Sequence, residues 1–177
     1  MRHLKHYLAA TALVMAIPHG APAEVVSLDA TGFAVRVEHR IAAPPSAVFA
    51  ALLEPGRWWN GEHSWSGDAT NMTLDPRVGG CFCEKLPKSG GESVHMRVIA
   101  IEPGRLLRMN GALGPFQAMG VAGTLSWEVT ADGAGSRLVQ TYALGGHMGG
   151  QATALAPIVD GVMSGQAERL KAFAEKR

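Results

Sequence analysis

Residues 155–174 read LAPIVDGVMSGQAERLKAFA, and this stretch decides the fold. At about 100° per residue its large apolar side chains fall in one arc of a helix, while Glu168 and Lys171 fall on the other side. Gln166 lies near the centre of the arc. The pattern predicts a long C-terminal helix that buries one face. The arc comprises Leu155, Ile158, Val159, Val162, Met163, Leu170, Phe173 and Ala174.

A run of predicted strands precedes this helix. Apolar and polar residues alternate most clearly over 121–130, which is typical of a half-buried strand. Two short helices are expected after the first strand, at 45–53 and 57–60. A long helix across a curved antiparallel sheet is a two-layer α+β arrangement. The predicted strands are 33–41, 81–86, 93–102, 105–113, 121–130 and 137–144.

The N-terminus has the features of a secretory signal peptide. Residues 1–7 are basic and contain no acid, an apolar run extends from 8 to 17, and Ala21-Pro22-Ala23 supplies the small residues that a signal peptidase requires. An apolar run of about ten residues spans roughly 15 Å as a helix, half of a bilayer's hydrocarbon core. We therefore expect cleavage after Ala23, export to the periplasm or beyond the cell, and no stable membrane insertion afterwards.

The rest of the chain is expected to hold one domain. We assign 1–23 to the signal peptide, 24–32 to an N-terminal linker and 33–177 to the domain, which is of ordinary size for a single core. The whole chain carries a formal charge of +1, and losing Arg2 and Lys5 with the signal lowers that charge to −1. A charge so close to zero gives no reason to expect nucleic acid as a partner.

Several short motifs are shared with a known family. They are Ala43-Pro-Pro-Ser-Ala-Val-Phe49, Trp58-Trp59, Gly79-Gly80, Ile101-Glu-Pro-Gly-Arg-Leu106, and Leu155-Ala-Pro-Ile-Val-Asp-Gly-Val162 with Leu170-Lys171. Together with the element order, they resemble the START-like (SRPBCC) superfamily over 33–177. The most similar branch is that of activators of the heat-shock chaperone ATPase, alongside polyketide cyclase-like proteins.

This resemblance implies a helix-grip fold, in which a curved antiparallel sheet wraps around the long C-terminal helix and encloses a deep apolar cavity. It also implies binding of lipids or polyketides and, in some members, cyclisation or dehydration. Chaperone activators work in the cytosol, so the expected export argues against that role for this chain.

Ten residues are candidates for a ligand site in such a cavity. A buried amide without a partner costs about 1 to 3 kcal/mol, so Gln166 should bond either a ligand or the protein backbone. Tryptophans near a loop often form a pocket mouth, whereas Trp127 fits either core or cavity wall. His63 and His147 are either site residues or solvated. The candidates are Trp58, Trp59, His63, Trp65, Trp127, Tyr142, His147, Val159, Met163 and Gln166.

Other polar and small residues have ordinary structural readings. His95 alternates with the apolar Met96 and is expected to face solvent. Asp75 precedes a proline and favours a turn. Gly161 and Gly165 each cost about 1 kcal/mol in a helix interior, which suggests that another part of the chain approaches the helix there.

Cys81 and Cys83 lie two residues apart on a predicted strand. Same-face residues on a regular strand are about 6 to 7 Å apart, whereas a disulfide needs Cβ atoms about 3.8 Å apart. We therefore expect two small buried thiols, with a disulfide or zinc and redox use as alternatives. No spacing of a recognised metal or cofactor motif is present.

Three functions fit these observations. The first is an exported protein that binds a small apolar molecule, lipid-like or polyketide-like, between the sheet and the C-terminal helix. The second is a cyclase, dehydratase or hydrolase that uses the same cavity with His63, His147 or Asp75 as proton carriers. The third is a module that binds a partner protein through its sheet. No catalytic residue or oligomeric state is assigned.

Overall fold

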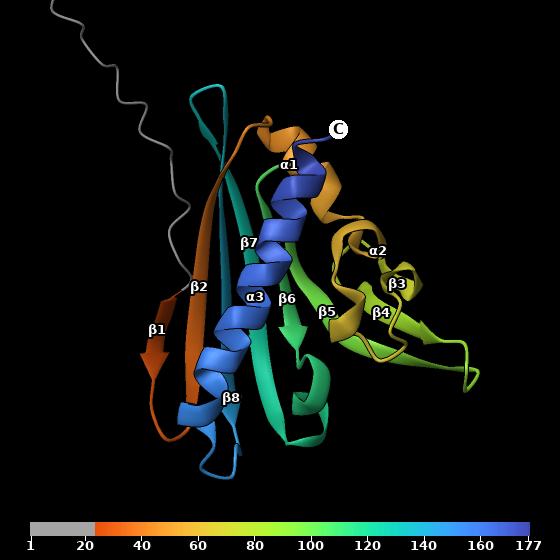
Figure 1. Cartoon of the computed structure of the whole chain (residues 1–177), viewed down its shortest axis with the longest axis vertical. Coiled ribbons are helices and arrows are strands. Elements are labelled where there is room, and N and C mark those ends of the chain that lie inside the picture. Colours follow the sequence, from red (N-terminus) through yellow and green to blue (C-terminus); the bar gives the residue numbers. More distant parts are fainter. Residues whose placement is uncertain (1–23) are drawn as a thin grey trace, which may run out of the picture.

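The computed structural model describes residues 24–177, which form eight strands, three α-helices and three short 3-10 helices (Figure 1). The predicted signal peptide, 1–23, lies outside the described residues. In chain order the elements are β1 (Glu24–Leu28), β2 (Gly32–Ile41), α1 (Pro45–Leu52), α2 (Pro55–Trp58), η1 (Gly61–His63), η2 (Ala69–Asn71), β3 (Met72–Leu74), β4 (Cys81–Leu86), β5 (Gly91–Glu102), β6 (Leu106–Gly111), η3 (Gly114–Ala118), β7 (Val121–Asp132), β8 (Gly135–Gly146) and α3 (Ala152–Ala174).

All eight strands join one antiparallel sheet, in the order β1-β2-β8-β7-β6-β5-β4-β3. In Figure 1, α3 runs across the face of this curved sheet, and the segment that carries η1 and η2 lies beside it on the side of β4 and β5. The α+β, helix-grip prediction is confirmed, including the two short helices, α1 and α2, that follow β2.

Alternating burial explains the central strands. Leu125, Trp127 and Val129 of β7 are buried on one face, and the residues between them are less so, except Ser126. A tight turn at Gly133, whose φ is +61°, returns the chain into β8, where Leu125 pairs with Tyr142. Such a left-handed backbone angle favours glycine, so the turn fixes the register of this hairpin.

The apolar arc of α3 faces the sheet and α1, as its periodicity predicts. Val159, Met163 and Leu170 are buried, whereas Ile158 at the edge of the arc is 62% exposed. The helix packs mainly on β2 and α1. None of the helices within 24–177 has the length and apolar character needed to cross a membrane.

Residues 24–32 do not form the expected linker. Glu24–Leu28 is strand β1, which pairs antiparallel with β2 from Glu24 opposite Arg36 to Leu28 opposite Phe33. Asp29 shapes the connecting turn, because its carboxylate accepts hydrogen bonds from the backbone N–H groups of Thr31 and Gly32. The strand lacks a clear alternation of burial, so its sequence carries little of the signal that identifies the other strands.

Cys81 and Cys83 form a disulfide, so the prediction of two free thiols is wrong. Their Cα atoms are 5.4 Å apart, inside the range that disulfides occupy. The pairing of β4 with β5 shifts register between Phe82 and Cys83, and the chain departs from the regular pleat there. The expected separation of 6 to 7 Å assumed a regular strand.

Candidate functional site

A cavity of about 350 Å³ lies between α3, the segments of η1 and η3, and strands β5 and β8. Most of its wall is apolar, and a few polar groups reach it. The residues that line it are Trp59, Glu62, His63, Ser64, Trp65, His95, Leu113, Gly114, Pro115, Phe116, Tyr142, Leu155, Ile158, Val159, Val162 and Met163.

The first part of the apolar arc of α3 supplies one wall. Val159 and Met163 are buried in it, and the largely exposed Ile158 borders the cavity at the protein surface. The structure therefore brings these two predicted candidates, Val159 and Met163, into the cavity wall together with predicted residues from two other segments. Those residues are Trp59, His63, Trp65 and Tyr142.

The segment after α2 positions the tryptophan and histidine candidates. The indole Nε1 of Trp59 donates a hydrogen bond to the backbone carbonyl of His63 at 3.0 Å, so the end of η1 is held against the Trp59 ring. The guanidinium of Arg169, on α3, donates to the carbonyl of Trp58 at 2.8 Å. The long helix thus holds the start of the segment, while Trp65 at its end is 51% exposed.

Tyr142 places a hydroxyl group in the wall from β8. Its oxygen accepts a hydrogen bond from the backbone N–H of Leu113 at 3.1 Å. Burial raises the pKa of the Tyr142 phenol well above its usual value of 10, an effect only partly offset by this hydrogen bond. The phenol therefore stays neutral at physiological pH and retains its proton for donation.

Glu84, on β4, is a fully buried carboxylate. It accepts hydrogen bonds from the backbone N–H of Trp65 at 3.0 Å and of Ser66 at 2.5 Å. Burial by itself would raise the pKa of Glu84, but the hydrogen bonds from Ser66, Trp65 and His95 outweigh it, and the pKa lies below its usual value. The buried group is therefore ionised at neutral pH.

His95 is the partner of Glu84, and the expectation that it faces solvent is wrong. Its side chain is buried, lines the cavity, and places Nε2 2.9 Å from Oε2 of Glu84. In the β4–β5 ladder Cys83 pairs with Val94 and Phe82 with Met96, so His95 is the extra residue of a bulge. A bulge interrupts the period of two, and His95 and Met96 are both buried.

Three of the predicted site residues lie outside the cavity wall. Trp58 and Trp127 belong to the core, where their rings meet edge to face at a centroid distance of 5.7 Å. Gln166 is fully buried, and its Oε1 accepts a hydrogen bond from the backbone N–H of Asn60 at 2.9 Å. The structural reading accounts for this oxygen, whereas the buried Nε2 of Gln166 has no partner among the described residues.

Two of the proton carriers proposed from sequence are also outside the cavity. His147 is exposed in the glycine-rich connection between β8 and α3, and it is not among the residues that line the cavity. Asp75 pairs with Arg77 at 2.8 Å near the surface, and its backbone belongs to the turn before β4. Only His63 of that set borders the cavity.

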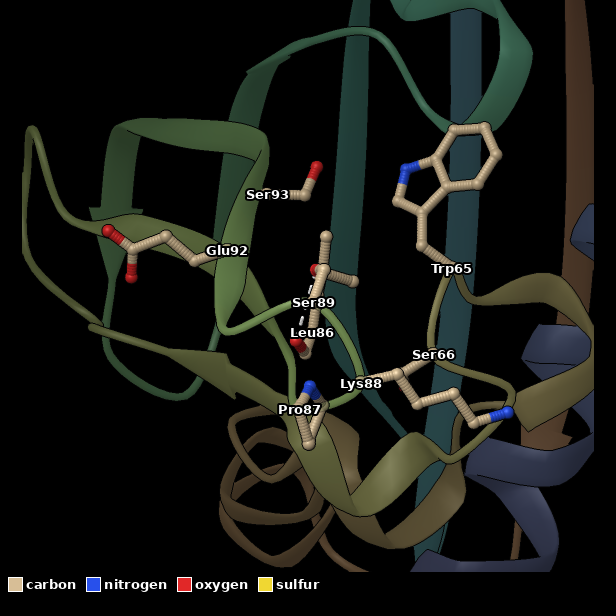
Figure 2. Close-up of a pocket in the computed structure, with 8 residues that line it drawn as sticks. All are labelled: Trp65, Ser66, Leu86, Pro87, Lys88, Ser89, Glu92 and Ser93. Atoms are coloured by element: carbon tan, nitrogen blue, oxygen red, sulfur yellow. Dashed lines mark hydrogen bonds between the residues drawn. The ribbon is translucent and has the colours of Figure 1, made fainter.

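A second, open groove of about 550 Å³ shares Trp65 with the cavity. Figure 2 shows the indole of Trp65 on one side and residues of the β4–β5 hairpin on the other, with the carboxylate of Glu92 pointing away from the ring. The other lining residues are Ser66, Leu86, Pro87, Lys88, Ser89 and Ser93. Trp65 therefore separates the two hollows.

Within the described part of the chain, no three His, Cys, Asp or Glu side chains gather closely enough to hold a metal ion.

A family model described as polyketide cyclase / dehydrase and lipid transport matches residues 32–175. No curated protein sequence matches the chain.

Solved structures share the fold at low sequence identity. A protein from Mesorhizobium loti, MLL2253, is 21% identical with a TM-score of 0.59, covering 81% of this chain and 97% of its own. A Rhizobium leguminosarum protein is 20% identical with a TM-score of 0.58, and the match covers 88% of this chain and 97% of that protein. The di-domain ARO/CYC StfQ of the steffimycin biosynthetic pathway is 16% identical with a TM-score of 0.56, and the match covers 83% of this chain and 52% of StfQ.

Proposed function

Because the chain belongs to the polyketide cyclase / dehydrase and lipid transport family, we propose that it binds a small apolar molecule, lipid-like or polyketide-like, in the cavity beneath α3. The observation that carries this proposal is the cavity itself. About 350 Å³ lies at the lower end of the range of small-molecule sites. An apolar wall with a few polar groups is the usual composition of such sites.

The chemistry of the wall supports a compact ligand with one polar end. Leu155, Val159 and Met163 offer apolar surface along the helix, and apolar burial contributes about 25 cal/mol per Å². The Tyr142 hydroxyl can donate a hydrogen bond to a carbonyl or hydroxyl oxygen of that ligand. A flat or bicyclic molecule with a single oxygen function fits this set of contacts.

We also place this binding outside the cytosol, after removal of residues 1–23. The basic, apolar and small-residue pattern of the N-terminus supports export. The Cys81–Cys83 disulfide supports it as well, since disulfides persist mainly in oxidising compartments. Fractionation of the producing cells and N-terminal sequencing would test this point separately. A full-length chain found in the cytosol would refute export and leave the binding proposal standing.

The binding proposal is tested with protein purified from its own cells. Native mass spectrometry should show a co-purifying small molecule, and a fluorescent fatty acid or 2-naphthol should bind the emptied protein. Met163→Trp fills the cavity, and we expect affinity to fall about tenfold or more, about 1.4 kcal/mol, because the indole occupies volume that the ligand needs.

Ala172→Trp is the matched control, because Ala172 is exposed on the outer side of the same helix. We expect it to bind both probes like the parent protein. Circular dichroism would confirm that both variants fold. If the parent protein carries no ligand and binds neither probe, or if the two variants bind equally, the proposal fails.

A further inference from the structure

We propose that Glu84 and His95 form a proton-transfer dyad that makes the cavity a catalytic site, in which His95 removes a proton from the carbon next to a carbonyl group. The inference rests on the proposed function, because the substrate is a small apolar molecule in the same cavity. It goes further because it assigns a reaction, names the base, and gives the substrate class as an enolisable ketone.

The hydrogen bonds of Glu84 determine which nitrogen of His95 carries the proton. Glu84 already accepts two backbone N–H groups and is ionised, so it presents an acceptor to Nε2 of His95 at 2.9 Å. Nε2 must therefore be the protonated nitrogen. In a neutral imidazole the other nitrogen, Nδ1, is then a free base.

Nδ1 of His95 is buried and has no hydrogen-bond partner among the described residues. A buried polar atom left without a partner costs about 1 to 3 kcal/mol, which a purely structural pair would not need to lose. His95 lines the cavity, and Phe82 packs against its ring at a centroid distance of 5.5 Å. The ring is thus fixed at the cavity wall, with Nδ1 buried and without a partner among the described residues.

The bulge in β5 is what turns this histidine inward. A regular strand would send neighbouring side chains to opposite faces, so His95 and Met96 could not both lie on the core face. Bulges are common where a strand redirects a side chain into an active site. Here the inserted residue is the one with titratable chemistry.

Tyr142 supplies the complementary group. Its neutral hydroxyl lies in the same cavity wall and retains its proton for donation. A carbonyl oxygen that accepts this hydrogen bond is polarised, and the negative charge that develops on it during proton removal is stabilised. The cavity therefore combines a base with a donor for the resulting enolate oxygen.

The reaction balances without any other reactant. The proton leaves the α-carbon for Nδ1 of His95, and its bonding electron pair becomes the enolate double bond as charge moves to the oxygen. The carboxylate of Glu84 stabilises the imidazolium that forms. Exchange requires the proton on Nδ1 to be replaced by a solvent hydron, which then returns to the carbon, whereas delivery of a proton from Nδ1 to the oxygen gives the enol tautomer. Glu84 acts through His95 and is a positioning residue.

The test uses 2-tetralone, a compact bicyclic ketone, as the probe. Its α-protons exchange with deuterium in heavy water, which proton NMR follows directly. We expect the full protein to accelerate this exchange and His95→Gln to lower the catalysed rate about 100-fold or more, the usual contribution of a general base. Tyr142→Phe should lower it by a comparable factor. His147→Gln, at an exposed histidine, should leave it unchanged.

The pH profile distinguishes the positioning role of Glu84 from a structural one. The ionisable groups that line the cavity beside His95 are Glu62 and His63 of η1 and Tyr142 of β8, and Glu84 of β4 contacts it directly. Glu84→Gln removes the carboxylate that stabilises the positive charge formed on the His95 ring during proton removal, so its pH profile of exchange should differ from that of the parent protein. A purely structural role would lower the rate without moving the profile.

Binding and catalysis are read separately. Quenching of tryptophan fluorescence measures 2-tetralone binding, which His95→Gln should retain. Binding by the parent protein without accelerated exchange would overturn this inference and leave the binding proposal intact, whereas absence of binding would overturn both. Equal exchange rates for His95→Gln and the parent protein would also overturn it.

A measurement on the unmutated protein covers the case in which His95→Gln does not fold. Nitrogen-15 shifts of the His95 ring at neutral pH should show a protonated Nε2 and an unprotonated Nδ1. The opposite tautomer would rule His95 out as the base.

Discussion

Replacing Glu84 by glutamine tests whether one buried carboxylate holds the edge of the cavity. The carboxylate accepts hydrogen bonds from the N–H groups of Trp65 and Ser66 and bonds Nε2 of His95. Glutamine has one acceptor oxygen and an NH2 group, so at least one of these donors is left facing another donor. A buried donor without a partner costs about 1 to 3 kcal/mol, and we expect Glu84→Gln to lose about 2 kcal/mol of unfolding free energy.

For a domain of this size such a loss lowers the melting temperature by roughly 4 to 8 °C, which circular dichroism measures. Glu92→Gln is the matched control, since Glu92 is exposed and its carboxylate points away from Trp65 in Figure 2. We expect it to change stability by no more than about 0.5 kcal/mol. Hydrogen exchange at the Trp65 and Ser66 amides should accelerate only in Glu84→Gln. If the two variants melt together and exchange alike, Glu84 does not hold this segment.

Three further predictions concern stability. Gly161→Ala and Gly165→Ala should each raise the unfolding free energy by about 1 kcal/mol in urea titrations, because an added Cβ meets no atom within 4 Å. Hydrogen bonds from Arg137 and Arg36 lower the pKa of Glu38 to about 2. At this partly exposed site the ionised carboxylate therefore adds about 1 kcal/mol to the unfolding free energy above pH 4.5, and this stabilisation is lost as the pH falls toward 2. In Glu38→Gln this part of the acid-induced loss of stability should be absent. Reducing the Cys81–Cys83 disulfide should add 2 Da to the mass measured under denaturing conditions. It should lower the unfolding free energy by about 1.5 kcal/mol or less, because the loop that the disulfide closes is short.

The elements with a strong periodic signal could be predicted from sequence. Strand β7 and helix α3 follow the periods of 2 and 3.6 over most of their length, and the buried faces that these periods predict follow from local geometry. For that reason Val159 and Met163 could be assigned to the cavity before its shape was known. Whether they contact a ligand stays a prediction.

The Glu84–His95 pair could not be predicted, because its geometry depends on the register of two strands. The position of a bulge is set by the partner strand and leaves no local signal in β5, where His95 and Met96 simply alternate in type. The one clue that the sequence offers is that Glu84 falls on the same face of its strand as Phe82, and this identifies no partner.

The sequence also could not tell which environment each residue of the same type occupies. Trp58 and Trp59 pack against each other at a centroid distance of 5.5 Å, yet only Trp59 borders the cavity, and the chain leaves helical geometry at that residue. Gly161 and Gly165 suggested close packing on α3, yet both lie on its exposed side. Composition alone does not tell which side of a helix glycine occupies.

Within residues 24–177 the sheet ends on each side in its shortest strands, which disfavours pairing with another molecule. An edge strand presents unpaired N–H and C=O groups that can recruit a strand from another molecule. β1 has five residues and an irregularity between Val25 and Ser27, and β3 has three residues. Neither offers a long, flat template for cross-β growth. An insertion that lengthened β1 with alternating valine and threonine would remove this protection.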